Sequence, residues 1–147
     1  MAFSVDGDYI AVGGLKSRLH IFSLADGQLH YSITTPSPIK ALVWLPGAEQ
    51  TLVCACHSGI LINIIVRPGV STRFDLRSGP SHTYCNTKVT MNLSCFRAQH
   101  HTVEFMAVDT STCYLATGSG LDVRVWKGDK HRMSSYTSLR FIYLHIC

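Results

Sequence analysis

The chain has 147 residues, of which 46% are hydrophobic and only 15% charged, a composition that supports a packed core and excludes a wholly disordered chain. Lysine and arginine number 13 against 9 aspartate and glutamate residues, so the formal net charge is +4, and the basic residues form no run. A scattered charge of this size mainly affects solubility, and we expect binding neither to nucleic acid nor to a membrane.

The N-terminal segment carries Asp6 and Asp8 where a secretory signal would have basic and then apolar residues. The longest apolar run, 60–66, is interrupted by Asn63 and is far shorter than the roughly 20 residues needed to cross a bilayer. We therefore expect a cytoplasmic or nuclear protein that is not secreted. In such a compartment disulfides are rare, which predicts that the six cysteines are buried thiols.

Short runs rich in β-branched and aromatic residues alternate with turn residues along the chain, a pattern typical of many antiparallel strands. Asp-Gly pairs precede two of the first three runs and predict tight turns, because glycine accepts the positive φ that such turns require. The expected strands fall in three sets: 9–14, 18–24 and 28–34; then 39–45, 51–56, 60–66 and 71–76; then 103–108, 113–117 and 121–126.

The first and third sets share an internal repeat. Residues 1–14 align without a gap with residues 106–119, and one deletion later the run 19–22 (Leu-His-Ile-Phe) lies over 123–126 (Val-Arg-Val-Trp). The second set fits the same pattern more loosely. The identical residues are Met1, Ala2, Tyr9, Ala11 and Gly13, lying over Met106, Ala107, Tyr114, Ala116 and Gly118.

The spacing of the sets matches a known repeat length. The first two begin about forty residues apart, which is the period of a four-stranded propeller blade. The third begins about twenty residues later than this period requires. We therefore expect the segment 77–101, which is rich in polar and turn residues, to be a surface insertion.

The recurring pattern resembles the WD-repeat family in a degenerate form. It consists of an apolar strand, a turn with Asp-Gly, an aromatic-Ile/Leu-Ala-x-Gly run, and an alternating run that ends in Trp or Phe. The closest stretch is 114–119 (Tyr-Leu-Ala-Thr-Gly-Ser) leading to 123–126, although Lys127 follows Trp126 where the family has aspartate. The resemblance implies an all-β fold, a partial β-propeller of about three four-stranded antiparallel blades. Another antiparallel β sandwich or barrel is the alternative.

In this interpretation the blades cover about 1–35, 36–76 and 102–127, and together form a partial propeller over 1–127. Residues 128–147 are expected to be a tail that fits no blade. Closed propellers need about four to eight blades, and open blades expose apolar surface and unpaired strand edges. We therefore expect a fragment of a longer propeller and self-association through the open blade edges.

The resemblance also implies a structural network inside the blade. In typical blades a His, a Ser or Thr, an Asp and a Trp are joined by hydrogen bonds. Thr117 and Trp126 match two members of this set, and His101 lies at about the place of the histidine. The family's aspartate would fall near Gly120, whereas the acid here is Asp122.

The family displays loops that bind other proteins, so the resemblance implies a scaffold whose partners are proteins. From the expected loop positions, the predicted partner contacts are Lys16, Arg18, Lys40 and Glu104.

A propeller-based enzyme or a metal-binding domain is the alternative function. Cys54 and Cys56 lie two residues apart, but zinc sites pair such cysteines with a second similar pair. No Gly-x-Ser-x-Gly nucleophile motif occurs in the sequence. We therefore expect no enzyme activity, no cofactor, and no catalytic, cofactor-binding or metal-binding residues.

Overall fold

A computed structural model describes residues 1–47, 50–66, 72–75, 93–99, 101–109, 111, 114–120, 122–129 and 132–140. For 72–75, 93–97, 128–129 and 132–140 only the backbone is described. All regular structure in these residues is β-strand, as expected from the sequence. Among the described residues there is no helix long and apolar enough to span a membrane.

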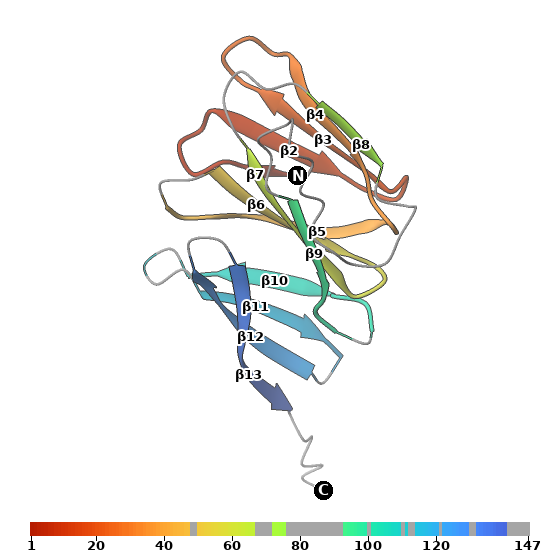
Figure 1. The fold of residues 1–147 in the computed structure, drawn as a ribbon, viewed down its shortest axis with the longest axis vertical. Coiled ribbons are helices and arrows are strands. Elements are labelled where there is room, and N and C mark those ends of the chain that lie inside the picture. Colours follow the sequence, from red (N-terminus) through yellow and green to blue (C-terminus); the bar gives the residue numbers. More distant parts are fainter. Residues whose placement is uncertain are drawn as a thin grey trace, which may run out of the picture.

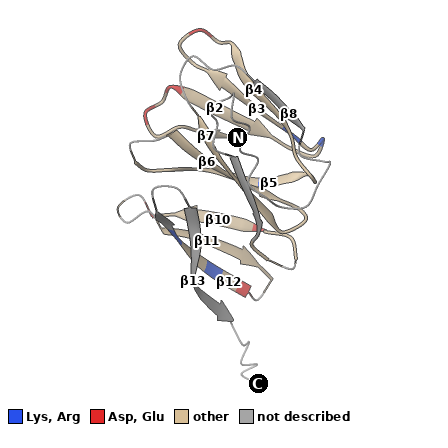
Figure 2. Cartoon of the chain, viewed as in Figure 1, with Lys and Arg blue, Asp and Glu red and all other residues tan. Residues whose placement is uncertain are grey.

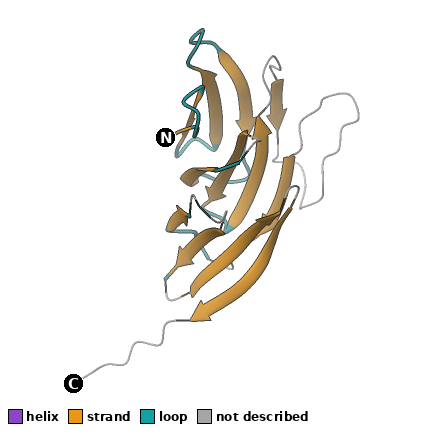
Figure 3. Cartoon of the chain, turned by 90° about the vertical axis from the view of Figure 1, so that its left-hand side faces the viewer, coloured by secondary structure: helices purple, strands orange, loops and turns teal. Residues whose placement is uncertain are grey.

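The strands form three sheets that lie one above another in Figure 1 and appear as separate layers in Figure 3. Blade 1 has the order β1-β2-β3-β4-β8, blade 2 the order β5-β6-β7-β9, and blade 3 the order β10-β11-β12-β13. The strands are β1 (Ala2–Phe3), β2 (Tyr9–Gly13), β3 (Arg18–Ser23), β4 (Leu29–Thr34), β5 (Ile39–Leu45), β6 (Gln50–Cys56), β7 (Ile60–Val66), β8 (Thr72–Asp75), β9 (Leu93–Arg97), β10 (Phe105–Val108), β11 (Tyr114–Ser119), β12 (Asp122–Asp129) and β13 (Arg132–Arg140).

The register of the strands confirms the internal repeat. Ala2 pairs with Ala11 in blade 1, and Ala107 pairs with Ala116 in blade 3, as the gapless alignment requires. In both blades the pairing between the third and fourth strands shifts at the same aligned position. The shifts fall between Ile21 and Phe22 in blade 1 and between Val125 and Trp126 in blade 3.

The fourth strand of blade 2 is not the one expected. The strand predicted at 71–76 exists as β8, but it pairs in parallel with β4 at the edge of blade 1. Blade 2 is completed instead by β9, which comes from the segment 77–101 that was expected to be an insertion. An edge strand joins a sheet through its backbone groups alone. Each doubling of the connecting loop's length adds only about 0.6 kcal/mol to the free energy of loop closure. The nearest sheet in sequence is therefore not always the one that the strand joins.

The end of blade 3 also differs from the expectation. Residues 128–147 were expected to fit no blade, yet β13 pairs with β12 from Asp122 to Asp129 and forms the fourth strand. The run 132–140 is rich in Ser, Thr and Tyr and lacks a clear apolar alternation, and a strand at a sheet edge needs only backbone hydrogen bonds. Residues 141–147 lie outside the described residues.

Blade 2 is the centre of the core because both of its faces are covered. One cluster joins blade 1 to blade 2: Tyr9, Ala11, Leu19, Ile21, Tyr31, Ile33, Ile39, Trp44, Leu52, Cys54, Cys56, Ile62, Ile64 and Val66. A second joins blade 2 to blade 3: Leu45, Val53, Ala55, Leu61, Ala98, Val103, Leu115 and Trp126. Successive side chains of a strand point to opposite faces, which explains why β6 and β7 are apolar almost throughout.

Gly59 offers a test of how tightly blade 3 is linked to blade 2. A Cβ at Gly59 would lie 2.3 Å from the backbone oxygen of Gln99, whereas nothing lies within 4 Å of one at Gly27. Both glycines have positive φ, +77° and +68° respectively, so both alanine variants carry the same backbone strain. We expect Gly27→Ala to cost about 1 kcal/mol and Gly59→Ala about 1–3 kcal/mol more, measured by urea unfolding. Equal losses of stability in the two variants would show that the link between blades 2 and 3 leaves room for a Cβ at Gly59.

Candidate protein-interaction surface

Five connections between strands gather at one end of the stack, which we call the linker end: the turns at 14–17, at 57–59 and at Gly120 and the links between blades at 35–38 and 98–104. Backbone hydrogen bonds hold them together. The amide of Thr35 donates to Ser17 O at 2.9 Å, and that of His57 to Pro38 O at 2.7 Å. The amide of Ala98 donates to Gly59 O at 2.9 Å.

All four residues predicted as partner contacts lie at the linker end. Lys16 is in the turn between β2 and β3, Arg18 begins β3, Lys40 is the second residue of β5, and Glu104 directly precedes β10. Each is exposed. The carboxylate of Glu104 accepts a hydrogen bond from the amide of Gly120 at 3.3 Å. The structure therefore brings these residues to one end of the stack, and their role in binding stays a prediction.

The two ends of the stack differ in charge. At the linker end the exposed side chains include the cations Lys16, Arg18 and Lys40. The opposite end exposes carboxylates on the loops of blade 1, which are red in Figure 2, and on the loop that follows β10. These acids are Asp6, Asp8, Asp26 and Asp109.

Two of those acids are held in their charged form. A hydrogen bond from the Ser4 hydroxyl, followed by one from the amide of Asp8, lowers the pKa of Asp6. The amide of Gln28 and the Ser23 hydroxyl lower the pKa of Asp26 in the same way. Asp6 and Asp26 therefore stay charged at neutral pH. The exposed charges are mostly acidic at the opposite end, which also carries Lys127, and mostly basic at the linker end, which also carries Glu104.

A buried polar network fixes the link between blades 2 and 3. The indole nitrogen of Trp126 donates to Thr117 Oγ1 at 2.9 Å, and Thr117 is fully buried. The side-chain amide of Gln99, which is 1% exposed, donates to Thr117 O at 3.2 Å and lies 3.4 Å from Asp122 O. Thus Gln99 joins the link at 98–104 to both β11 and β12.

The position that the sequence suggested for His101 is held by Gln99. His101 is exposed, so it is not a member of the buried network. The carbonyl oxygens of Gln99 and His101 both lie against Gly59, which fixes the path of this link. The donor in this network is the Gln99 amide, which the pattern that predicted His101 does not indicate.

Hydroxyl groups hold the first link, at 35–38. Ser37 Oγ lies 2.9 Å from Ser58 Oγ and accepts from the amide of Ser58 at 2.9 Å. Thr35 Oγ1 donates to Ser37 O at 2.8 Å. A polar side chain therefore attaches each link to a neighbouring element: Ser37 attaches the first link to the turn at 57–59, and Gln99 attaches the second to β11 and β12.

Cys54 and Cys56 lie beneath the first link; both are fully buried thiols, and neither forms a disulfide. A hydrogen bond from Cys54 lowers the pKa of Cys56, with further hydrogen bonds from Ser37 and Thr35 acting in the same direction against the effect of burial. A thiol without access to solvent packs as a small apolar side chain. In the part of the chain that the structure describes, no three His, Cys, Asp or Glu side chains gather to hold a metal ion.

No family model and no curated protein matches the chain. By structure it is similar to the β-propeller domain of Cps50 (Swd1) from Myceliophteria thermophila, with a TM-score of 0.61 and 20% sequence identity. The match covers 95% of this chain and 41% of that one. At this level of identity the likeness shows the fold: the three sheets form part of a β-propeller, as predicted, and span less than half of that domain.

The network around Thr117 can be tested by a double-mutant cycle. Thr117→Val removes the acceptor for the Trp126 indole, and Trp126→Phe removes the donor. Each should lower the free energy of unfolding by about 1–3 kcal/mol, and the double variant should lose clearly less than the sum. His101→Ala, at an exposed side chain, serves as the control and should change stability by less than about 0.5 kcal/mol. A large loss of unfolding free energy in His101→Ala would show that His101 does belong to the network.

Proposed function

We propose that this chain is a non-catalytic scaffold of the WD-repeat type that binds partner proteins through its linker end. The observation that carries the proposal is the gathering of exposed Lys16, Arg18 and Lys40 in or next to the turns and links at one end of a rigid stack of sheets. Loops held by a rigid scaffold are the usual place for binding residues, and the likeness to a propeller domain supports such a scaffold. We also propose that it acts in the cytoplasm or nucleus.

The turn between β2 and β3 has the features of a contact element. Leu15 at its tip is 82% exposed, beside Lys16. Ser17 has a φ of +54°, a left-handed conformation that residues other than glycine rarely adopt. The hydrogen bond from Thr35 to the Ser17 carbonyl holds that conformation. The turn thus presents an apolar side chain and two cations, Lys16 and Arg18, in a fixed arrangement.

The charge of the linker end defines the chemistry of the partner. Exposed ion pairs contribute little affinity, at most about 1 kcal/mol each, but they steer association and exclude partners of like charge. A surface that carries three cations and the exposed apolar side chain of Leu15 suits an acidic segment that contains an apolar residue. We therefore propose that the partner presents an acidic, partly apolar peptide segment to this end.

Charge reversal at matched positions tests this function. Lys16→Glu and Lys40→Glu place acid at the linker end, whereas Lys127→Glu makes the same change at the opposite end of blade 3, where the exposed Lys127 lies 5.9 Å from the Tyr114 ring. Binding of fluorescent acidic, neutral and basic peptides that share an apolar residue would be measured by anisotropy. The acidic peptide should bind best, and each linker-end variant should weaken it roughly three- to tenfold, with more salt weakening it further.

The Lys127→Glu variant is the control for this experiment. Lys127→Glu should leave the affinity for the acidic peptide within about twofold of the unmodified chain, because this side chain lies outside the proposed surface. If all three variants weaken binding equally, or if acidic and basic peptides bind alike, the linker end is not the binding surface.

A further inference from the structure

Each outer blade has one face packed on blade 2 and one face that nothing covers within the described residues. In Figure 1 the open face of blade 1 is at the top of the stack and that of blade 3 at the bottom. The two blades bury opposite faces of the same repeat. The packed face of blade 3 therefore indicates how the open face of blade 1 would pack. The packed face of blade 1 indicates the same for the open face of blade 3.

The open face of blade 1 carries an apolar row across its first four strands. Cross-strand pairing joins Phe3 to Ile10, Ile10 to Phe22, and Phe22 to Leu29. Phe3 is 61% exposed and Leu29 37% exposed, and beside this row Val12 is 38% exposed. Such a contiguous apolar face is unusual on a soluble surface and marks a site of contact.

The equivalent row of blade 3 is the one that packs on blade 2. There Val108 pairs with Leu115 and Leu115 with Trp126, the positions aligned with Phe3, Ile10 and Phe22. Leu115 and Trp126 are buried against the side chains of blade 2, and Val108 packs partly buried on the same cluster. The open face of blade 1 is therefore the same kind of surface, without the blade that covers it in blade 3.

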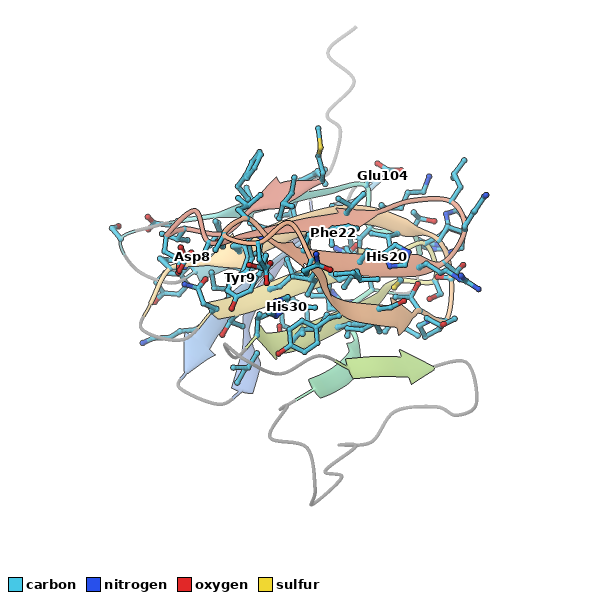
Figure 4. The ribbon with its side chains drawn as sticks, turned by 90° about the horizontal axis from the view of Figure 1, so that it is seen from above. Asp8, Tyr9, His20, Phe22, His30 and Glu104 are labelled. Carbon is cyan, nitrogen blue, oxygen red and sulfur yellow. The ribbon has the colours of Figure 1, made fainter. Side chains whose placement is uncertain are left out.

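His20 adds a polar feature to this open face. It aligns with Arg124, whose guanidinium donates to the carbonyl of Ala98 in the link between blades 2 and 3. His20 lies beside Phe22 on β3, with ring centroids 6.3 Å apart (Figure 4). Its Nδ1 atom is inaccessible to solvent and has no hydrogen-bond partner. His20 as a whole is partly exposed, so a docked blade would contact the rest of its ring without reaching that atom.

The open face of blade 3 is the equivalent of the packed face of blade 1. Ala107, Ala116 and Val125 form a cross-strand row there, and they align with Ala2, Ala11 and Ile21, which pack on blade 2. One detail differs between the two faces. Ile39 of blade 2 covers Gly13, whereas Phe105, from blade 3 itself and 47% exposed, covers the aligned Gly118. A blade docking here would contact the ring of Phe105.

We propose that a second copy of this chain docks head to tail, with the open face of its blade 3 on the open face of blade 1. This arrangement continues the interface that the chain already forms twice between its own blades. The same contact made in both directions joins two sets of three blades into a closed ring of six, within the range of about four to eight that propellers use. The inference rests on the repeat and the packing, and does not depend on the partner surface proposed above.

Light scattering on the chromatographed chain tests this assembly. The unmodified chain should be a dimer. Val12→Glu on the open face of blade 1 and Ala107→Glu on that of blade 3 should each give a monomer, because each puts a charge into both contacts of the ring. Val12 and Ala107 are exposed in the single chain, so neither change should disturb its own fold, which circular dichroism and urea unfolding would verify.

Mixing the two variants distinguishes head-to-tail docking from other arrangements. In a mixed dimer one contact contains both substitutions and the other contains neither, so an equimolar mixture should regain dimers. Leu15→Glu, in the exposed turn between β2 and β3 and outside both cross-strand rows, should remain a dimer. A monomeric unmodified chain, an Ala107→Glu variant that still dimerises, a mixture that stays monomeric, or an assembly larger than a dimer would each overturn the proposal.

Discussion

The structure depends on apolar packing against both faces of blade 2. Its two central strands, β6 and β7, send alternate side chains into two clusters, so that Cys54 meets blade 1 while Val53 and Ala55 meet blade 3. Blade 2 therefore needs a neighbour on each side to remove its apolar surface from water. Blades 1 and 3 provide these two neighbours. Each of them keeps one open face, and the equivalent face of the other blade is buried against blade 2.

At the linker end, polar side chains hold the links between blades in place by hydrogen bonds. Ser37 attaches the first link to the turn of blade 2, and Gln99 attaches the second link to blade 3 through Thr117. A buried amide must find partners or cost free energy, so Gln99 fixes the position of its link as well as holding it. The exposed charges in and next to the links and turns are consequently held by a rigid scaffold, as binding residues usually are.

The sequence predicted the strands of blades 1 and 2 from residue 9 to residue 66, because alternation and Asp-Gly turns are local properties. It also predicted the common register of the first and third blades, since matching residues impose matching pairs such as Ala2 with Ala11. It placed β8 in the wrong blade and did not predict β9 or β13. These strands lie at sheet edges, where backbone hydrogen bonds from any extended segment can complete the ladder.

For the candidate surface, too, the sequence determined some features and the tertiary structure determined the others. The sequence by itself determined that Trp126 and Thr117 belong to one blade and that Lys16, Arg18, Lys40 and Glu104 fall in or next to turns and links. Only the tertiary structure decided that these four gather at one end, that Gln99 and not His101 is buried beside Thr117, and which face of each blade is covered. The reason is physical: turns and alternation depend on neighbouring residues, whereas partners across blades are chosen by the packing of segments far apart in the chain.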